Sequence, residues 1–240
     1  MMADMRCHLA LLALALLGAP AQAFTAADTR TPLSAEVRPG RFVALHGRIG
    51  PGSEAVVRAA LDRAGPGRPT VLVDSPGGAI APALAIGRLI RARGLAVAVA
   101  RVAGSAPTDA DAQCASACVL VLAAGVRRSI GPGAEVGVHR LVDWTTYSRT
   151  WDVYRVLKRR GVVVGRELLS RRVLSSRDVY TDAPPRDYAA VERYLAAMGE
   201  TPGLVALMRA TPAAGLHWMT PAELGATRIA TDRDAFGAKS

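Results

Sequence analysis

The sequence predicts an α/β domain with a mostly parallel sheet. Between residues 42 and 138, short apolar runs typical of buried strands alternate with longer segments whose apolar residues recur at helical spacing. Strands that alternate with helices form βαβ units, and the strands of such units lie parallel. The chain has 240 residues, of which 50% are hydrophobic, enough for one sizeable core. We therefore expect one domain over residues 42–236, with an N-terminal linker over 24–41.

Each element follows from its residue pattern. The run TVLVD at 70–74 has three successive apolar residues, as in a strand buried on both faces. The segment 79–94 has apolar residues at helical spacing and stops at a glycine. The other expected strands are 42–49, 95–100, and two short ones around 126–130 and 135–138, and the other expected helices are 53–64 and about 114–124.

Residues 141–200 are predicted to form an added helical segment. The stretch KRRGVVVGRELLSRR at 158–172 mixes basic and aliphatic residues, which indicates a pair of amphipathic surface helices. Trp144, Trp151 and Tyr154 are spaced as on one helix face, so we expect them in the core. A role for this segment as a lid, an oligomer contact or a substrate platform stays open.

The N-terminus has the pattern of a secretory signal peptide. Arg6 precedes an apolar run from Leu9 to Leu17, and the A-x-A sequence at 21–23 ends the segment. We expect cleavage at about Ala23 and a periplasmic or secreted protein. No later segment is long and uncharged enough to span a bilayer.

The formal net charge is +10, and nearly all of the basic residues are arginine. A coding bias towards arginine explains this more simply than an anionic partner does. The densest basic stretch is interleaved with aliphatic rather than aromatic residues, so no nucleic-acid partner is expected. We also expect no cofactor, since the sequence has neither a G-x-G-x-x-G fingerprint nor a Walker A pattern. No metal site is expected, because the only cysteine pair of the mature chain has no histidine close to it in sequence.

Cys114 and Cys118 remain after signal cleavage, in a compartment that permits disulfides. On a helix, a four-residue spacing brings the two Cα atoms to about 6 Å, within the range of a disulfide. Such a bridge requires an irregular first helical turn. The alternative is two small buried apolar residues.

Three stretches carry side chains or backbone groups suited to acyl transfer. The buried strand 70–74 ends in SPGG, where glycine allows close backbone approach and the following helix start offers unpaired N–H groups. Ser116 lies at the next helix start, and His139 ends the apolar run EVGVH. A nucleophilic serine needs a base and donors for the tetrahedral oxygen. Taken separately, Ser116 is equally explained as a helix-start hydroxyl and His139 as a surface residue.

The stretches VDSPGG, QCASACVLVLAAG and VGVHR, in this order and spacing, resemble the Clp peptidase group of the crotonase-like superfamily. More closely, they resemble exported Clp-like proteins of bacteria. The resemblance covers roughly residues 42–140, with a weaker match at 219–232. It implies a crotonase/Clp-like fold of repeated ββα units around a parallel sheet.

The resemblance also implies roles for individual residues. Ser116 would be the nucleophile and His139 the general base, with the N–H groups of Gly77 and Ala117 as the oxyanion hole. The reaction would be acyl transfer to water at a peptide or ester bond. The residues implied to pair with an extended peptide substrate are Gly77, Gly78, Ala79 and Ile80.

The sequence departs from the Clp pattern at the third catalytic residue. No acid lies between Glu200 and Glu223, where the aspartate that orients the histidine is expected. Thr211 falls near that position, and Asp143 follows His139 by four residues. Asp182 and Asp187 are further candidates. The base then works in a dyad or a weak triad, or the site is impaired.

A serine–lysine dyad is the neighbouring option in the same superfamily. The chain has only two lysines, Lys158 and Lys239, and neither lies in the Clp-like region. His139 is therefore the preferred base.

Two functions from different classes follow. The first is an exported, ATP-independent serine peptidase that cleaves peptides or unfolded polypeptides. The second is a catalytically impaired protein on the same fold that binds peptides or partners in the periplasm. Acyl-CoA chemistry has little support, because no adenine-binding feature stands out. Assembly into a homo-oligomer stays open.

Overall fold

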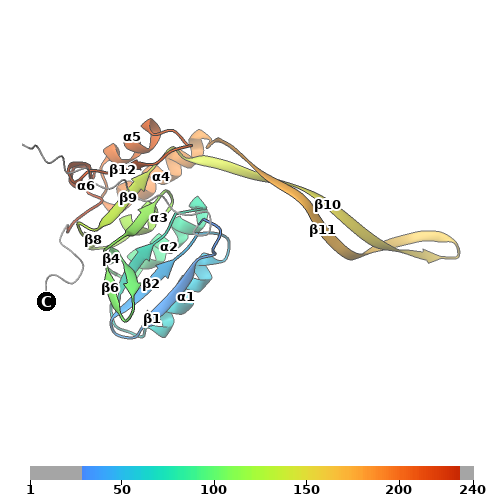
Figure 1. The fold of residues 1–240 in the computed structure, drawn as a ribbon, viewed down its shortest axis with the longest axis horizontal. Coiled ribbons are helices and arrows are strands. Elements are labelled where there is room, and N and C mark those ends of the chain that lie inside the picture. The colour runs from blue at the N-terminus through green and yellow to red at the C-terminus, as the bar shows by residue number, and fades with distance from the viewer. Residues whose placement is uncertain (1–28, 233–240) are drawn as a thin grey trace, which may run out of the picture.

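The computed structural model describes residues 29–232 and contains a five-stranded sheet in the order β1-β2-β3-β4-β8 (Figure 1). Its last four strands are parallel, and β1 pairs antiparallel with β2. The predicted α/β class and parallel sheet are thus present. The strands are β1 (Ser34–Arg38), β2 (Phe42–His46), β3 (Thr70–Asp74), β4 (Val97–Val99) and β8 (Arg128–Ile130). The linker predicted over 24–41 was wrong in part, since it contains β1.

The two faces of this sheet are covered differently. The helices α1 (Ser53–Arg63) and α2 (Ile80–Ala92) pack with α3 (Cys118–Ala123) against one face and form the main core. A small cluster that includes Leu72 and Ala98 lies on the other face, against the hairpin of β5 (Arg101–Ala103) and β6 (Ala106–Thr108). Burial on both faces explains why the three central residues of β3 are all apolar.

A second sheet, in the order β12-β9-β7, stands next to the end of β3 and positions the candidate site. Its strands are β7 (Ala112–Ala115), β9 (Ala134–Val138) and β12 (His217–Trp218). A β-bridge between Ser75 and Cys114 joins it to the residue that follows β3. The helices α4 (Pro185–Met198), α5 (Pro202–Ala210) and α6 (Pro221–Ala226) complete the body.

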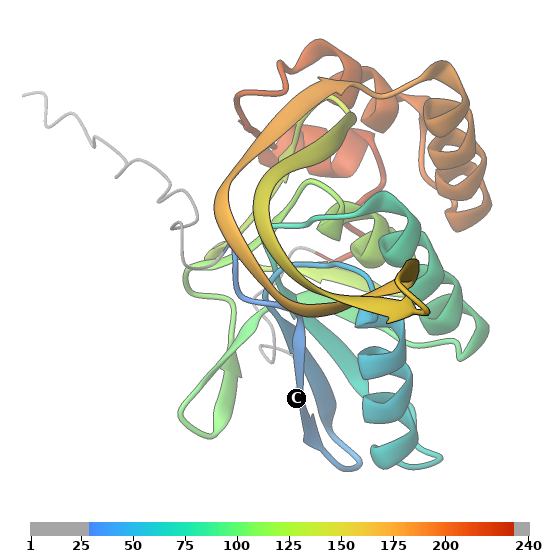
Figure 2. The ribbon, with the colours of Figure 1, turned by 90° about the vertical axis from the view of Figure 1, so that its right-hand side faces the viewer.

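The prediction of a helical segment over 141–200 was wrong except for α4. Residues 142–182 form one long antiparallel hairpin, β10 (Val142–Arg159) and β11 (Val162–Asp182), called the arm below. The arm extends far from the body as a curved, twisted ribbon (Figures 1 and 2). Trp151 and Tyr154, expected in the core, are 65% and 44% exposed on it.

The residues of the arm explain the strands. Both strands are rich in β-branched and aromatic residues, which favour extended backbone. The two strands are joined by Arg160 and Gly161, with φ values of 50° and 81°. Two consecutive residues with positive φ make the type I′ turn that matches the twist of a hairpin.

Shortening the arm is expected to leave the stability of the body unchanged. Ser148 and Ser176 are cross-strand partners, so residues 149–175 can be replaced by an Asn-Gly turn between them. Because the outer arm projects away from the core (Figure 1), the melting temperature should change by less than about 2 °C. Differential scanning calorimetry of the full-length and shortened chains measures this. A drop of about 10 °C would show that the outer arm stabilises the body.

Two predictions concern the signal peptide and membrane-spanning segments. The signal peptide predicted at 1–23 lies outside the described residues. Within residues 29–232, no helix is both long and apolar enough to cross a membrane.

Candidate active site

Ser116 lies at a sharp turn between β7 and α3. Its φ of 56° is in the left-handed region, which a residue other than glycine adopts at some energetic cost. The Ser116 N–H donates to the Gly137 carbonyl (2.8 Å), and the Ser116 carbonyl accepts from the Val119 N–H (3.1 Å). The backbone of this residue is therefore held from both sides, while its side chain lines a cavity.

A disulfide between Cys114 and Cys118 closes the chain around this turn, with a Cα–Cα distance of 5.3 Å. The expected helix from about residue 114 begins later, because Cys114 belongs to β7 and Cys118 is the first residue of α3. The bridge thus connects the end of a strand to the start of a helix. Both cysteines are fully buried.

Reduction of this disulfide is expected to destabilise the protein and its Ser116 turn together. By loop-closure entropy, a bridge that closes so short a loop contributes about 2 kcal/mol. We expect the melting temperature to fall by about 4–8 °C under reductant, and labelling of Ser116 by a fluorophosphonate probe to slow. The Cys114→Ala/Cys118→Ala variant should match the reduced protein and should not respond to reductant. Equal melting temperatures and labelling rates with and without reductant would contradict this.

The Gly-Gly turn lies directly against Ser116. A Cβ atom on Gly77 would stand 2.4 Å from the Ala115 carbonyl oxygen and 2.8 Å from the Cβ of Ser116. Gly78, with a φ of 137°, is equally tight, since its Cβ would stand 2.0 Å from the Ile49 carbonyl oxygen. Only glycine fits either position, which is why the turn after β3 reads SPGG.

The hydrogen bonds of this turn differ from the expected oxyanion hole. The Gly77 N–H donates to the Ser75 Oγ (3.1 Å), and so already has an acceptor. Ile49 pairs with the other side of the turn, donating to the Gly77 carbonyl (2.7 Å) and accepting from the Ala79 N–H (2.9 Å). In such a parallel bridge, the N–H and carbonyl of Gly78 point to the opposite edge.

Two backbone N–H groups next to Ser116 have no recorded acceptor within the described part of the chain. They belong to Gly78 and to Ala117, the N-cap residue of α3. The donor pair available for a developing oxyanion is therefore Gly78 and Ala117 rather than Gly77 and Ala117.

His139 follows β9 and is held by a backbone group rather than by an acid. Its Nδ1 lies 2.7 Å from the Arg140 carbonyl oxygen. Because a carbonyl only accepts, Nδ1 carries the proton and the neutral ring has its lone pair on Nε2. Between residues 29 and 232, no hydrogen bond joins His139 to a carboxylate or to Ser116.

Among the residues that the structure describes, none of the expected third residues forms a hydrogen bond with His139. The Thr211 hydroxyl donates to the Leu207 carbonyl (2.9 Å), although the Thr211 carbonyl accepts from the Arg140 N–H (3.0 Å). Asp143 is exposed on the arm and pairs in register with Thr181.

The remaining candidates are also placed elsewhere. Asp182 lies 3.5 Å from Arg140, and Asp187 lies 3.8 Å from Arg186. Lys158 is close to the turn of the arm, and Lys239 lies outside the described residues.

One cavity of about 210 Å³ brings the principal predicted residues together. Ser116, Ala117, His139 and the Gly-Gly turn all line it, although they come from three separate stretches of the chain. Its other lining residues are Thr29, Arg48, Pro76, Ile80, Leu120, Val138, Leu141, Val142, Tyr180 and Met208. Ala79, expected to contact substrate, is not among them.

The sequence did not identify several of these residues as part of a site. Val142 and Tyr180 come from the root of the arm, and Met208 comes from α5. Nothing in the sequence distinguishes them from other apolar residues. Within residues 29–232, no three His, Cys, Asp or Glu side chains are grouped so that they could hold a metal ion.

No protein-family model matches the chain, and no curated protein matches it in sequence. Among solved structures, it is similar to a serine-to-alanine variant of the 1510-N membrane-bound stomatin-specific protease. The TM-score is 0.48 at 12% identity, with 83% of this chain and 80% of that chain covered. A lysine-to-alanine variant of that protease, in complex with a substrate peptide, gives a TM-score of 0.47 at 13% identity, with coverages of 83% and 75%. Likeness at this level does not assign an activity to this chain.

Proposed function

We propose that the protein is a serine hydrolase that cleaves peptide bonds, with Ser116 as the nucleophile and His139 as the base. The observation that carries this proposal is the single cavity lined by Ser116, His139, Ala117 and Gly78. These residues supply the three kinds of group that acyl transfer needs: a hydroxyl, a neutral imidazole and free N–H donors.

The proposed reaction proceeds through an acyl-enzyme. Nε2 of His139 takes the proton of the Ser116 hydroxyl while Oγ attacks the carbonyl carbon of the substrate. The N–H groups of Gly78 and Ala117 donate to the oxygen that becomes negative. The imidazolium then gives its proton to the leaving amine, and a water molecule activated by the same ring hydrolyses the acyl-enzyme.

The backbone partner of His139 indicates a slow enzyme. The Arg140 carbonyl fixes the required tautomer, with the proton on Nδ1. A neutral carbonyl stabilises the imidazolium less than a carboxylate does. In a serine triad, losing the orienting carboxylate costs about 10⁴-fold in rate, largely because the histidine then adopts the wrong tautomer. Because the Arg140 carbonyl fixes the tautomer here, the expected loss is smaller and comes from the weaker stabilisation of the imidazolium.

The cavity favours an extended peptide with an apolar side chain. The open edge of Gly78 offers a carbonyl that can accept from a substrate N–H, as a strand edge that binds a peptide does, while the Gly78 N–H serves the reacting carbonyl oxygen. Ile80, Leu120 and Met208 give the cavity an apolar lining. At about 210 Å³ the cavity is smaller than the ~300–1,000 Å³ typical for drug-sized ligands, and suits a single side chain.

Export is part of this proposal. The signal-like N-terminus and the disulfide between Cys114 and Cys118 both fit a compartment that permits disulfides. A peptidase in such a compartment works without ATP and therefore on peptides or unfolded chains.

Labelling by a fluorophosphonate probe tests the proposed nucleophile. We expect the purified mature protein to be labelled, Ser116→Ala to lose all labelling, and His139→Ala to be labelled at least about 100-fold more slowly. Ser148→Ala, which removes an exposed hydroxyl on the arm, is the matched control and should be labelled normally. Labelling that survives in Ser116→Ala would place the reactive group elsewhere.

A peptide-binding protein without catalysis is the second candidate. It is favoured by the missing hydrogen bond between Ser116 and His139 and by the lack of a recorded carboxylate partner for the histidine, both in the described residues. If the folded protein is not labelled but binds an extended apolar peptide, and Gly78→Ala abolishes the binding, this candidate replaces the hydrolase.

A further inference from the structure

The arm carries nearly all of the exposed large apolar side chains among residues 29–232. Sixteen such residues are exposed, and fourteen of them lie between Tyr147 and Tyr180. A two-stranded ribbon with water on both faces is marginally stable by itself. Apolar exposure confined to one projecting element therefore indicates a surface that meets a partner.

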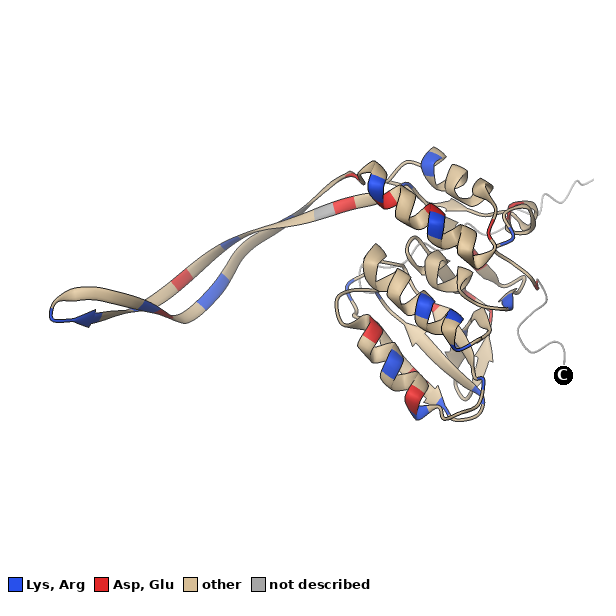
Figure 3. Cartoon of the chain, turned by 180° about the vertical axis from the view of Figure 1, so that it is seen from behind, with Lys and Arg blue, Asp and Glu red and all other residues tan. Residues whose placement is uncertain are grey.

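The end of the arm, residues 156–166, has a distinct composition and is called the tip. It contains five apolar residues, four basic residues and two glycines, and no acidic residue. Val162, Val163 and Val164 are 66%, 52% and 62% exposed. The basic residues of the tip are Lys158, Arg159, Arg160 and Arg166, and they are exposed as well. Figure 3 shows basic residues on the ribbon at this end of the arm.

The acidic side chains behind the tip are already paired. Arg171 donates to both carboxylate oxygens of Asp152 at 2.8 Å, and these bonds lower the pKa of Asp152. Arg155 donates to Glu167 at 3.2 Å. Within the described part of the chain, none of the four basic residues of the tip forms an ion pair, so their charge is available to an external anion.

The charge of the rest of the molecule argues against a second copy as that partner. Outside the arm, the described residues have 18 basic and 12 acidic side chains, so the body is also positive. A positive tip docked on a positive body gains nothing from their net charges. The three exposed valines, in turn, do not suit a nucleic-acid backbone, which is contacted by polar and aromatic groups.

We propose that the tip docks on the surface of an anionic lipid bilayer. Val162, Val163 and Val164 enter the boundary between headgroups and acyl chains, while the basic side chains reach back to the lipid phosphates. Trp151 and Tyr154, exposed just behind the tip, are residue types that favour the membrane–water interface. The 18-residue strand β10 spans at most about 60 Å, which sets the distance of the cavity from the bilayer.

Vesicle flotation tests this proposal on the purified mature protein. The vesicles are phosphatidylcholine mixed with phosphatidylglycerol, and phosphatidylcholine alone. One variant replaces the four basic residues of the tip by glutamine: Lys158→Gln, Arg159→Gln, Arg160→Gln and Arg166→Gln. A second variant makes the tip polar: Val162→Ser, Val163→Ser and Val164→Ser.

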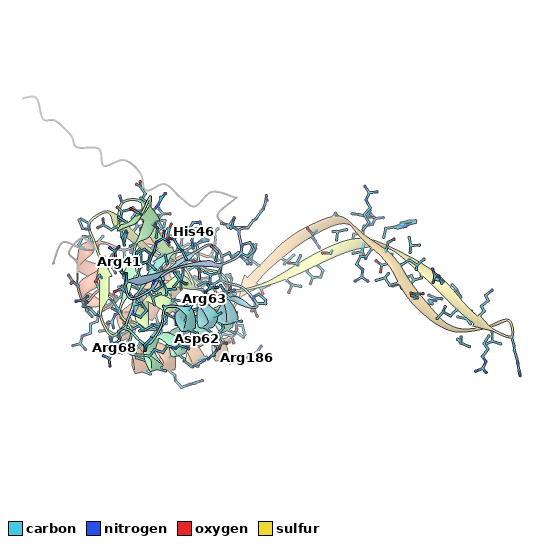
Figure 4. All side chains as sticks on the ribbon, turned by 90° about the horizontal axis from the view of Figure 1, so that it is seen from below. Arg41, His46, Asp62, Arg63, Arg68 and Arg186 are labelled. Carbon is cyan, nitrogen blue, oxygen red and sulfur yellow. A yellow bond between two sulfur atoms is a disulfide. The ribbon has the colours of Figure 1, made fainter. Side chains whose placement is uncertain are left out.

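A control variant removes the same charge from the body. Its substitutions are Arg41→Gln, Arg63→Gln, Arg68→Gln and Arg186→Gln, at exposed residues that Figure 4 labels on the body. The melting temperature of every variant reports on the body separately, and this readout, like docking of the tip, does not depend on the proposed hydrolase activity.

We expect the wild type to float with the anionic vesicles only. The charge variant of the tip should bind at least about tenfold more weakly, since each basic residue near such a surface contributes about fivefold. The serine variant should also lose binding, and the body variant should bind within about twofold of the wild type. High salt should weaken binding by the wild type.

Three results would overturn the proposal. The first is a wild type that does not float with anionic vesicles, or floats equally with neutral ones. The second is equal loss of binding in the tip and body charge variants, which would reflect net charge alone. The third is a wild-type dimer by light scattering that the tip variants convert to monomer without any vesicle binding, which would assign the tip to a second copy.

Discussion

Replacing Gly77 by alanine is expected to abolish reaction of Ser116 with a fluorophosphonate probe. The new methyl group would stand 2.4 Å from the Ala115 carbonyl oxygen, 2.8 Å from the Ala117 nitrogen and 2.8 Å from the Ser116 Cβ. All three are atoms of the turn that holds the nucleophile, and two of them are backbone, so the turn itself must move. Loss of one oxyanion donor alone costs about 10²–10³-fold, and we expect at least that loss in labelling rate.

A control variant at a second glycine distinguishes the effect of this steric clash from the effect of placing alanine at a positive φ. Gly94, at the end of α2, also has a positive φ, of 63°, but nothing lies within 4 Å of the Cβ that it would gain. Gly94→Ala should cost about 1 kcal/mol of folding free energy and leave labelling unchanged. If Gly77→Ala is labelled as fast as Gly94→Ala at equal stability, the Gly-Gly turn is not part of the site.

Gly78→Ala tests the other half of the turn. The clash of this methyl group is with Ile49, on the side away from Ser116, and the Gly78 N–H is the proposed oxyanion donor. We expect a loss of labelling comparable to that of Gly77→Ala.

The strands of the body were predictable because buried strands appear in the sequence as short apolar runs. The run 70–74 matches β3, and the predicted strand at 135–138 lies within β9. The helix expected from about 114 begins at Cys118, because Ala112–Ala115 pairs with β9 as β7. Small and apolar residues are compatible with both helix and strand, and the pairing with a neighbouring strand determines which of the two forms.

The arm was missed because its period-two pattern is interrupted. The pairing of β10 with β11 shifts at three places, between Arg149 and Thr150, Val153 and Tyr154, and Leu157 and Lys158. Each shift inserts one extra residue in β11 and changes which face the following side chains occupy. Aliphatic and basic residues then recur at irregular intervals, which resembles the spacing of an amphipathic helix.

The parts of the site that the sequence indicated are residues whose chemistry is tied to the end of an element. Gly77 and Gly78 follow a strand, Ser116 precedes a helix, and His139 follows a strand. The partner of His139 was not predictable, because it is a backbone carbonyl. Thr211 was suggested by its position in the sequence but does not orient the histidine. Its hydroxyl donates to the carbonyl four residues earlier, as is common for threonine in a helix.

The largest pH-dependent effect on stability is expected from the buried pair of Arg128 and Glu200. The Glu200 side chain is fully buried, and an Nη atom of Arg128 lies 3.1 Å from its Oε1. Arg128 also donates to the carbonyls of Gly125 (3.0 Å), Arg228 (2.6 Å) and Ile229 (3.2 Å), which ties the C-terminal residues to β8. Burial raises the pKa of Glu200 to about 7, and the charge of Arg128 only partly opposes this.

The sign of the effect follows from the direction of that shift. Because the pKa of Glu200 in the folded state lies above the ordinary value of 4.5, the folded protein still holds the proton where the unfolded chain has lost it. The contribution of Glu200 to stability is therefore complete below about pH 4.5 and is lost as the pH rises to about 7. Glu200→Gln keeps the shape of the side chain and removes its titration. The free energy of unfolding of the variant, relative to that of the wild type, should therefore rise by on the order of 2 kcal/mol between pH 5 and pH 8.

Urea unfolding of the oxidised protein at pH 5 and pH 8 measures this difference. Histidine titration affects the wild type and the variant equally, so it cancels in the comparison. Glu54→Gln, at an exposed glutamate paired with Arg58 on α1, is the matched control and should show no comparable pH-dependent gain. Arg128→Met should instead destabilise by about 3–5 kcal/mol at pH 8, because it leaves the Glu200 charge buried without its partner. A pH-independent difference between Glu200→Gln and the wild type would show that Glu200 does not titrate differently in the folded protein.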